Sequence, residues 1–398
     1  MKTYKYIIVG GGMTGSAAVM GIRENDPDGS IAMFTKEFFE PYNRPPLTKG
    51  LWSGKNVDSI IRPMDKYEID LFLGTAVINV HPQENQIITE EKELFEYQYL
   101  LLATGGDPIQ FPDAPEGVIA YRTRSDFHQL MELTENKNHL CIIGGGFIGS
   151  ELAAALVNNK KQVTMIFPEI GICGTIFPDD LSAFLVEYYQ DKGVSVLHGN
   201  LVDAISKAGD SYKVQYHNIE SKAAFEAEFD AVVVGIGIQP NSSLAENAGI
   251  VVEDGIVVNE FLQTNIPNVF AAGDVANFLH VPLGKRLRVE HEDNANTMGM
   301  IAGKNMSGDM QPYDHFPFFY SDLFDLGYEA VGDLDKDLEI FEDWLEPYKK
   351  GTVYYLQDGK IRGLIFWNLW GKVDHGREVI QLGKTYKKSD LQDFFLEE

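Results

Sequence analysis

Two glycine-rich segments carry the clearest chemistry in this 398-residue sequence. Each follows a short β-branched run and has the spacing G-x-G-x-x-G, formed by Gly10, Gly12 and Gly15 and by Gly144, Gly146 and Gly149. The first glycine makes a tight turn, the second lets the backbone approach a pyrophosphate, and the third lets helix and strand pack closely. The helix N-terminus then stabilises the anion. One such segment also occurs in turns without a ligand, but two indicate two dinucleotides and electron transfer between them.

The elements that must position these glycines have β-α-β patterns. Residues 4–9 and 30–35 are expected to be strands around a helix from about 15 to 24, and strands at 139–143 and 162–167 flank the second turn. The first glycines lie far enough apart for one complete domain per copy. From about residue 314 the pattern changes, and Asp358-Gly359 joins two strand-like runs as a hairpin. We predict an α/β protein with two Rossmann-like domains and a C-terminal α+β domain.

The composition excludes several functions. The formal net charge of −26 argues against nucleic-acid binding. No apolar run has the length of a membrane span, so no transmembrane segment is expected. The sequence leads from Met1 straight into the first strand, which leaves no room for a signal peptide and favours a cytoplasmic protein. The histidines lack metal-ligand spacing, so no metal is predicted.

The two cysteines, Cys141 and Cys173, argue against disulfide chemistry because they form no C-x-x-C pair. Cys141 lies in a strand-like run and is interpreted as a buried apolar residue. Cys173 lies in a loop beside the second predicted nucleotide. A bystander is favoured there over a reactive thiol, and its role stays open.

Further blocks of the sequence carry a family resemblance. These are residues 41–49, 103–106, 144–152, 271–274, 289–291, 321–323, 326–330 and 364–368. With the two fingerprints they resemble the two-dinucleotide flavoprotein reductases, and in finer detail apoptosis-inducing factor and the NADH-dependent ferredoxin reductases. This group belongs to the pyridine nucleotide-disulfide oxidoreductase superfamily but lacks the redox disulfide. The resemblance covers nearly the whole chain.

The resemblance implies a domain plan and two cofactors. Residues 1–113 and 240–313 would bind FAD, and residues 114–239 would be an inserted NAD-binding domain. Residues 314–398 would form the C-terminal α+β domain, which in this family forms a dimer interface or covers the flavin. A homodimer is therefore compatible with the resemblance.

The resemblance also implies which residues hold FAD. The first three glycines would bind the pyrophosphate, and Asp274 the ribityl or pyrophosphate region. Arg44 and Arg122 fall at positions that contact FAD, where a cationic fork suits phosphate or flavin oxygens. Tyr320 replaces a tryptophan that lies against the flavin in apoptosis-inducing factor, and Glu37 is a candidate for the adenosine ribose. The remaining FAD candidates are Thr104, Gly105, Gly273, Glu290 and His291.

The candidates for the redox chemistry are Lys49, Glu151, Phe147 and His291. Lys49 matches a lysine beside the flavin, where an ammonium stabilises the reduced, anionic form, and Glu151 matches its paired glutamate. Phe147 matches an aromatic residue between flavin and nicotinamide. Taken alone, Lys49 could be a solvated lysine and Glu151 a carboxylate that complements a helix dipole. The family blocks favour the functional interpretation of the pair.

The second fingerprint, with Ile148 and Gly237, is predicted to bind the nicotinamide dinucleotide. Glu169 follows the strand that ends at Phe167, and no Arg or Lys occurs from 168 to 180. A carboxylate accepts a hydrogen bond from a ribose 2′-OH, whereas a 2′-phosphate needs a cation. The sequence therefore predicts NAD rather than NADP.

The resulting expectation is an FAD-dependent NADH oxidoreductase that passes electrons to a ferredoxin, a rubredoxin, a quinone or oxygen. Lys285, Arg286 and Arg288 either dock an acidic iron–sulfur protein or are solvated or phosphate-binding. The alternative function is a redox-controlled interaction protein, in which NADH alters dimerisation. The long charged insertion of apoptosis-inducing factor and a mitochondrial presequence are both missing, which disfavours that alternative.

Overall fold

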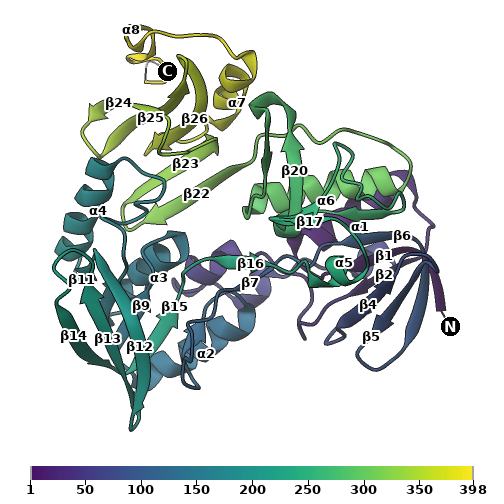
Figure 1. Ribbon diagram of the computed structural model, residues 1–398, viewed down its shortest axis with the longest axis horizontal. Helices are drawn as coiled ribbons and strands as arrows, with labels where there is room; N and C mark the ends of the chain where they lie inside the picture. The colour runs from purple at the N-terminus through teal and green to yellow at the C-terminus, as the bar shows by residue number, and fades with distance from the viewer. Residues whose placement is uncertain (1, 397–398) are drawn as a thin grey trace. The chain divides into compact units, whose positions relative to one another are not determined.

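The computed structural model describes residues 2–396, which divide into two compact units (Figure 1). The first unit comprises residues 1–44, 56–107 and 239–317, and the second comprises residues 45–55, 108–238 and 318–398. The chain therefore passes several times from one unit to the other. Two of these passages lie in β7 (Gly106–Pro108) and β16 (Ile238–Pro240), which pair with each other.

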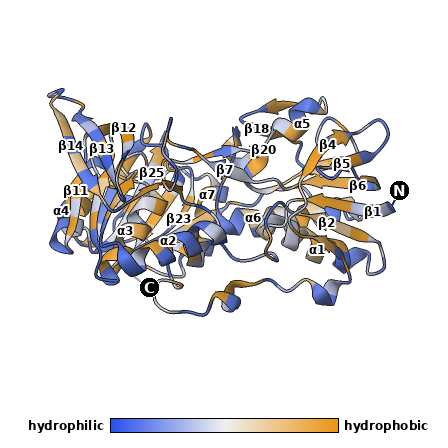
Figure 2. Cartoon of the chain, turned by 90° about the horizontal axis from the view of Figure 1, so that it is seen from below, coloured by the Kyte–Doolittle hydropathy of each residue, from blue (hydrophilic) through white to orange (hydrophobic). Residues whose placement is uncertain are grey.

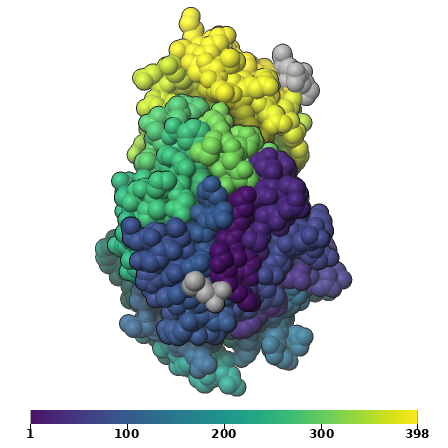
Figure 3. Space-filling view, turned by 90° about the vertical axis from the view of Figure 1, so that its right-hand side faces the viewer, coloured from purple at the N-terminus to yellow at the C-terminus, as the bar shows by residue number. Residues whose placement is uncertain are grey.

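A seven-stranded sheet forms the centre of the first unit. Its order is β3-β2-β1-β6-β5-β4, with β19 beside β6. The strands are β1 (Lys2–Val9), β2 (Ile31–Phe34), β3 (Asp70–Phe72), β4 (Val77–His81), β5 (Gln86–Thr89), β6 (Leu94–Leu102) and β19 (Val269–Ala271). Strand β1 runs parallel to both neighbours, with Ile7 opposite Ala32 and Leu100. These strands carry mainly hydrophobic residues (Figure 2), and in Figure 3 the N-terminal residues reach the surface beside the strands around residues 70–100.

Helices α1 (Met13–Asn25) and α6 (Glu292–Met306) of the first unit pack closely because glycines line their contact. A Cβ added at Gly21 would lie 2.1 Å from the carbonyl oxygen of Met300, and one at Gly303 would lie 2.1 Å from that of Ala18. The close contact explains why α1 is rich in small residues and carries no charge until its last turn. Helix α6 thereby fixes the helix that follows the first glycine turn.

Smaller elements complete the first unit. A four-stranded sheet consists of β17 (Val252–Glu253), β18 (Gly255–Val257), β20 (Ala276–His280) and β21 (Lys285–Leu287). The short helices are η2 (Val57–Ile60), η3 (Asp65–Tyr67), α5 (Ser243–Asn247), η4 (Gly273–Val275) and η5 (Val281–Leu283). Strand β18 runs parallel to β20, so η4 lies at the start of a paired strand.

The second unit contains a parallel sheet of order β11-β10-β9-β15-β8. The strands are β8 (Ile119–Ala120), β9 (His139–Ile143), β10 (Gln162–Ile166), β11 (Val194–Leu197) and β15 (Ala231–Val234). Its helices are η1 (Pro45–Thr48), α2 (Arg124–Asn136), α3 (Phe147–Asn158) and α4 (Asp179–Asp191). An antiparallel sheet of β12 (Asn200–Ala208), β13 (Ser211–Asn218) and β14 (Ala224–Phe229) precedes β15.

The C-terminal part of the second unit is an antiparallel sheet of order β22-β23-β26-β25-β24. The elements are β22 (Phe318–Leu323), β23 (Leu326–Gly332), β24 (Glu339–Glu346), β25 (Lys350–Gln357), β26 (Lys360–Trp367), α7 (Val373–Leu382) and α8 (Lys388–Leu391). Fully buried Trp367 stacks on Tyr328 with ring centroids 5.5 Å apart, and Phe177 from the loop before α4 meets both rings edge-on. These aromatic contacts join the sheet to the glycine-turn part of its unit.

The predicted fold class is confirmed: each of two regions with a parallel sheet contains one glycine turn, and an α+β region follows them in sequence. The predicted hairpin through Asp358-Gly359 is also present, between β25 and β26. Residues 45–55 belong to the second unit, although the sequence placed them in the first FAD-binding segment. The assignment of domains to cofactors stays a prediction. Among residues 2–396, no helix is long and apolar enough to cross a membrane.

Candidate functional site

The first glycine turn joins β1 to α1. Gly10 has φ +125°, and a Cβ there would lie 2.0 Å from the carbonyl oxygen of Ala103. A Cβ at Gly15 would lie 2.0 Å from the carbonyl oxygen of Gly10, so both positions require glycine. A Cβ at Gly12 would meet no described atom within 4 Å. Gly12 is the N-cap of α1 and has no side chain to cap it, so the turn has an open approach to the helix N-terminus, as a pyrophosphate requires.

Charged residues predicted to bind FAD gather in the first unit. Arg44 Nη2 lies 2.6 Å from Glu37 Oε1, and the Tyr42 hydroxyl donates to Glu37 Oε2 at 2.6 Å. Burial lowers the pKa of Arg44, but Tyr42, Glu37 and Asp274 raise it more, so its pKa lies above the ordinary value. Arg44, Glu37 and Asp274 therefore interact electrostatically. Both carboxylate oxygens of Glu37 already accept hydrogen bonds from neighbouring side chains. The sequence analysis, which proposed Glu37 as an acceptor for the adenosine ribose, did not predict these bonds.

Three smaller predicted residues shape the backbone of the first unit. Thr104 Oγ1 donates to the Asn241 carbonyl at 2.8 Å, and Gly105 has φ +64°. Gly273 has φ +78°, and a Cβ there would lie 2.2 Å from Thr14 Oγ1 on α1. The missing side chain of Gly273 thus lets the backbone just before Asp274 approach the helix that follows the first glycine turn.

Glu290 and His291 immediately precede α6. Glu290 Oε1 accepts from Arg288 Nη1 at 2.6 Å, and His291 is the N-cap residue of α6. Burial lowers the pKa of His291 to about 4, although Asp274 and Asp293 oppose this effect. The imidazole is therefore neutral near pH 7. It can donate or accept a hydrogen bond, but it does not supply a standing positive charge.

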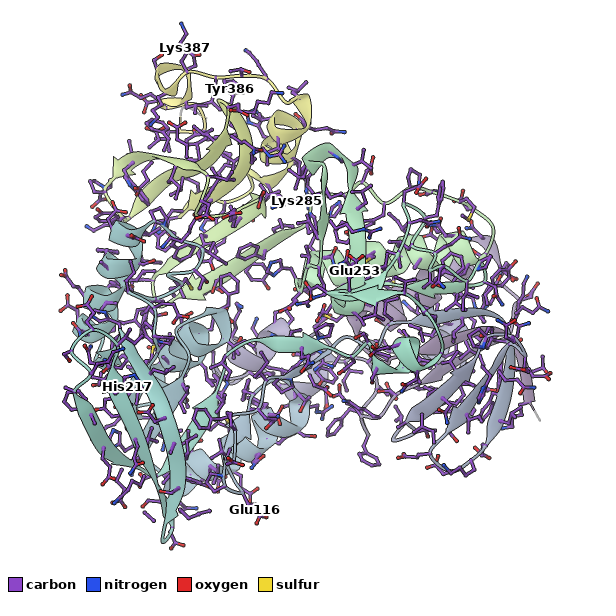
Figure 4. The ribbon with its side chains drawn as sticks, in the orientation of Figure 1. Glu116, His217, Glu253, Lys285, Tyr386 and Lys387 are labelled. Atoms are coloured by element: carbon purple, nitrogen blue, oxygen red, sulfur yellow. The ribbon has the colours of Figure 1, made fainter. Side chains whose placement is uncertain are left out.

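The predicted basic patch is largely engaged within the first unit. Arg288 Nε lies 2.9 Å from Asp254 Oδ1, in addition to its bond to Glu290. Arg286 Nη1 donates to the carbonyl oxygens of Asn277 and Val258 at 2.8 and 3.3 Å. Lys285 begins β21 (Figure 4). The two arginines therefore hold loops and strands of this unit, a structural role that the sequence analysis did not consider, and the docking and phosphate-binding alternatives stay predictions.

The second glycine turn joins β9 to α3 and repeats the geometry of the first. Gly144 has φ +118°, and a Cβ there would lie 2.3 Å from the carbonyl oxygen of Gly235. A Cβ at Gly149 would lie 2.2 Å from the carbonyl oxygen of Gly144, and one at Gly146 would meet no described atom within 4 Å. Ile148 lies in the first turn of α3, and its side chain would be 3.5 Å from a Cβ at Gly235. Gly237, which lies shortly after the end of β15, has φ +106°.

The predicted Lys49–Glu151 pair is present inside the second unit. Lys49 Nζ lies 2.5 Å from Glu151 Oε1, and the two side chains are 16% and 7% exposed. The segment that carries Lys49 is anchored at Leu47, whose carbonyl accepts from the Tyr121 hydroxyl at 2.6 Å and from Trp52 Nε1 at 2.9 Å. An ion pair this buried is costly unless further hydrogen bonds satisfy it.

Two residues that sequence reasoning did not single out provide those bonds. Thr48 Oγ1 donates to Glu151 Oε2 at 2.5 Å, and Ser321 Oγ donates to Glu151 Oε1 at 2.6 Å. Thr48 stands in the block 41–49 and Ser321 in the block 321–323, so the family resemblance was the available signal. Their convergence on one carboxylate could not be read from spacing, because Thr48 and Ser321 are far from Glu151 in sequence.

Aromatic rings surround this ion pair. The Phe147 ring, half-buried in the first turn of α3, lies 5.0 Å from the Phe319 ring. Lys49 Nζ lies 5.2 Å from the centroid of the Tyr320 ring, and Tyr320 is 37% exposed. The second unit therefore brings Phe147, Lys49, Glu151 and Tyr320 together in one neighbourhood, with apolar faces beside a fixed ammonium.

Glu169 lies in the loop after β10, which folds over the second glycine turn. The Cys173 amide donates to the Gly145 carbonyl at 2.8 Å, and a Cβ at Gly174 would lie 3.2 Å from Glu169 Cβ. Lys336, distant in sequence, donates to the Gly174 carbonyl at 2.8 Å and pairs with Asp179 at 2.5 Å. The Lys336 ammonium thus reaches this loop, but it is already paired with the Asp179 carboxylate.

The remaining FAD candidate, Arg122, also belongs to the second unit. Its backbone N–H donates to Asp126 Oδ2 at 2.9 Å, just before the Thr123 N-cap of α2. The predicted FAD-binding residues are therefore divided: Glu37, Arg44 and Asp274 lie in the first unit, and Arg122 and Tyr320 in the second.

The two cysteines are buried and unbonded to each other. Burial raises the pKa of Cys173 to about 12 and raises that of Cys141 above its ordinary value. Both are therefore protonated near neutral pH and poor nucleophiles. Among the described residues, no group of three or more His, Cys, Asp or Glu side chains could hold a metal ion.

Comparison with known proteins gives the family. Residues 4–299 match the model of the pyridine nucleotide-disulphide oxidoreductases, and residues 302–344 and 340–382 match that of the C-terminal region of mitochondrion-associated apoptosis-inducing factor. Mitochondrial apoptosis-inducing factor 1 from Dictyostelium discoideum is 35% identical over 97% of this chain and 80% of that protein. Monodehydroascorbate reductase 3 from Arabidopsis thaliana is 28% identical over 100% of this chain and 96% of that protein.

Solved structures agree with these sequence matches. A ferredoxin reductase from Rhodopseudomonas palustris has a TM-score of 0.90 and 26% identity, covering 99% of this chain and 98% of that one. Putidaredoxin reductase in its covalent complex with putidaredoxin has a TM-score of 0.90 and 25% identity, covering 100% and 97%.

The chain belongs to the pyridine nucleotide-disulphide oxidoreductase family. Within it, the similarity to apoptosis-inducing factor extends into the C-terminal region, which confirms the predicted resemblance. FAD and NAD(H) are the cofactors that this family uses, and they are the cofactors of this chain. Both glycine turns fit such groups, because each leaves open space at its second glycine.

Proposed function

We propose that the chain is an FAD-dependent NADH oxidoreductase that passes electrons on to a one-electron acceptor. The observation that carries the proposal is the buried Lys49–Glu151 pair beside Phe147, on the helix that the second glycine turn opens. The chemistry that bound FAD would supply is acceptance of a hydride from NADH and release of electrons to an acceptor. The protein's part is to orient the two nucleotides and to supply fixed charges.

Each residue has a defined part in this proposal. The open N-terminus of α3 would hold the NADH pyrophosphate, and Glu169 would accept from the adenosine ribose. The Lys49 ammonium, held by Glu151, would stabilise negative charge that develops during hydride transfer. The neutral His291 imidazole would serve as a hydrogen-bond partner in the first unit rather than as a cation. Neither cysteine takes part, because both thiols are buried and protonated.

The acceptor we favour is a small iron–sulfur protein. Two ferredoxin-type reductases match at 25–26% identity over nearly the whole chain, and the name of one of them includes its partner, putidaredoxin. Monodehydroascorbate reductase, another relative, is named for an acceptor that is a small organic radical and takes one electron. That relative therefore also fits transfer of one electron at a time. A quinone and oxygen remain outcomes of the test.

A second candidate function follows from the 35% identity to apoptosis-inducing factor and the match of its C-terminal region. In this alternative, reduction by NADH would change the association of the chain with itself or with other proteins. Such a protein would hold its reduced flavin for a long time, whereas a reductase would discharge it quickly.

The deciding experiment mixes the flavin-loaded protein with NADH without oxygen and follows loss of the oxidised-flavin absorbance. A ferredoxin, monodehydroascorbate, a quinone or air is then added, and reoxidation is timed while light scattering reports the oligomeric state. Fast reoxidation by ferredoxin at constant mass supports the reductase. Slow reoxidation by every acceptor, together with a change of mass, supports the alternative. Absence of flavin reduction by NADH contradicts both.

A further inference from the structure

The Glu151 carboxylate is bonded by three side chains from two separate segments of the second unit. Lys49 Nζ and Ser321 Oγ both lie near Oε1, at 2.5 and 2.6 Å, and Thr48 Oγ1 lies 2.5 Å from Oε2. Thr48 ends η1, Lys49 follows it, and Ser321 lies on β22. Glu151 itself lies on α3, so the carboxylate joins three elements that are distant in the sequence.

This arrangement fixes the carboxylate in one orientation. An ion pair through Oε1 alone would let the carboxylate turn about its terminal torsion, which is broad and roughly two-fold. The hydroxyl on Oε2 removes that freedom, and Ser321 fixes the position of the oxygen that Lys49 contacts. Lysine is a point charge on a flexible stem, so the place of its ammonium is set by its acceptor. The two hydroxyls therefore control where the positive charge lies.

The two hydroxyl donors are held by rigid surroundings. Thr48 is 8% exposed, β-branched and preceded by Pro45 and Pro46 in η1. Ser321 is 1% exposed and lies opposite Tyr328 in the β22–β23 pair, where the Tyr328 ring stacks on Trp367. Neither hydroxyl needs to be ordered at the moment of reaction, which is the condition for electrostatic preorganisation.

Three buried titratable groups beside Glu151 add no charge of their own near pH 7. Burial raises the pKa of Cys173 to about 12 and raises the pKa values of Tyr189 and Tyr328 well above their ordinary values. All three groups interact with Glu151 and are neutral near pH 7. A buried carboxylate is costly unless hydrogen-bonded, so Thr48 and Ser321 compensate for what the single ammonium leaves unsatisfied.

We propose that Thr48 and Ser321 are positioning residues for hydride transfer, and that they act through Glu151 on the Lys49 ammonium. The inference rests on the proposed function, because it assigns the two hydroxyls to the step in which NADH reduces the flavin. Neither hydroxyl needs to touch a cofactor. The C-terminal sheet thereby contributes directly to the geometry of the ion pair through Ser321.

The test measures the rate of flavin reduction in single turnovers with NADH, without oxygen, for Thr48→Val and Ser321→Ala. Each variant loses one hydrogen bond to a charged group, so the rate should fall roughly tenfold to a hundredfold. The FAD content and the NADH concentration for half-maximal rate should stay unchanged. Thr48→Ser keeps the hydroxyl and should restore the rate. Ser182→Ala and Thr352→Val remove buried hydroxyls of the same unit and should not slow reduction.

A double-mutant cycle separates positioning from a general structural role. In a Glu151→Gln background, Ser321→Ala should change the reduction rate less than about twofold, because the residue acts through the carboxylate. An equal effect in both backgrounds would overturn the proposal, and so would wild-type rates in the two single variants. If Thr48→Val does not fold, the Ser321→Ala cycle decides alone. A wild-type protein that NADH does not reduce would instead contradict the proposed function itself.

Discussion

The glycine turns at Gly10 in the first unit and at Gly144 in the second have nearly the same backbone but different surroundings. Their first glycines have φ +125° and +118°, and both second glycines face open space. Around the first turn lie paired charges, Arg44 with Glu37, and Asp274. Around the second lie a half-buried phenylalanine and a buried carboxylate on the helix itself.

In the proposed function, both turns would bind a nucleotide, and only the helix after the second turn would carry residues that take part in the chemistry. Helix α1 carries small residues because it packs closely on α6, and it holds no reactive group. Helix α3 carries Phe147 and Glu151 near its start. We therefore expect the same G-x-G-x-x-G spacing to retain FAD at the first turn and to present NADH for reaction at the second.

The largest expected effect comes from removing the ammonium beside the second turn. Lys49→Met should lower the rate of flavin reduction by NADH about a hundredfold, because it removes charge stabilisation and leaves a buried carboxylate without its cation. The variant should still retain its FAD. Single-turnover absorbance measures the rate, and Lys55→Met, an exposed lysine of the same segment, is the control.

The counterpart at the first turn should give the opposite pattern. Arg44→Met should weaken FAD retention roughly tenfold or more, because it removes a cationic fork and leaves Glu37 without its cationic partner. The FAD-loaded fraction should still be reduced by NADH. Gel filtration followed by the flavin-to-protein absorbance ratio measures retention. An Arg44→Met protein with full flavin and a slow reduction step would break the comparison.

A smaller effect is expected in the choice of dinucleotide. Glu169→Ala should raise the KM for NADH roughly tenfold, since a hydrogen bond from the ribose to a charged group is lost. Adding Asp179→Asn, which frees Lys336, should improve the use of NADPH. Steady-state kinetics with both nucleotides measure the ratio. An unchanged KM for NADH would show that Glu169 does not contact the ribose.

The smallest effect concerns the ends of the two helices. Asp26 caps the C-terminus of α1, and its hydrogen bond from Lys5 lowers its pKa to about 2, with help from Tyr6 and Gly29 against the effect of burial. Asn159 is the C-cap residue of α3, and its uncharged Nδ2 donates to the Ala155 carbonyl at 2.8 Å and to the Trp52 carbonyl at 3.0 Å. Helix α1 therefore ends at a cap residue that acid can protonate, whereas the cap residue of α3 is uncharged.

Because the pKa of Asp26 is lowered in the folded state, its stabilisation is present above about pH 4 and is lost as the pH falls towards about 2. Asp26→Asn should cost about 1–2 kcal/mol at neutral pH and little at the acid end. Thermal unfolding across this range, followed by flavin release, measures the difference. A pH-independent difference between the two proteins would show that the charge of Asp26 is not the cause.

The sequence predicted those features that depend on local signals. Both glycine turns, the strands before them and the Asp358-Gly359 hairpin require special backbone geometry, which glycine at fixed spacing reveals. The Lys49–Glu151 contact was predicted only through the family resemblance. Its presence in the structure supports that use of the resemblance, and the roles of these residues stay proposals.

The features that the sequence could not predict are contacts between distant segments. Ser321 reaches Glu151 across 170 positions, and Lys336 reaches Asp179 across 157. Such contacts depend on how the C-terminal sheet packs on its neighbours, and no local spacing encodes them. The absence of Arg and Lys from 168 to 180 gives no sign of Lys336 for the same reason. Likewise, the sequence around Glu37 does not predict that Arg44 and Tyr42 donate hydrogen bonds to its two carboxylate oxygens.

The most direct test of the central claim compares Gly12→Val with Gly146→Val. A Cβ at either position meets no described atom within 4 Å, so both proteins should fold, but a side chain there would exclude a pyrophosphate. Flavin content and flavin reduction by NADH are measured on both. Gly12→Val should lose FAD, whereas Gly146→Val should keep FAD but should no longer be reduced by NADH. Flavin retained in Gly12→Val, or lost in Gly146→Val, would contradict that claim.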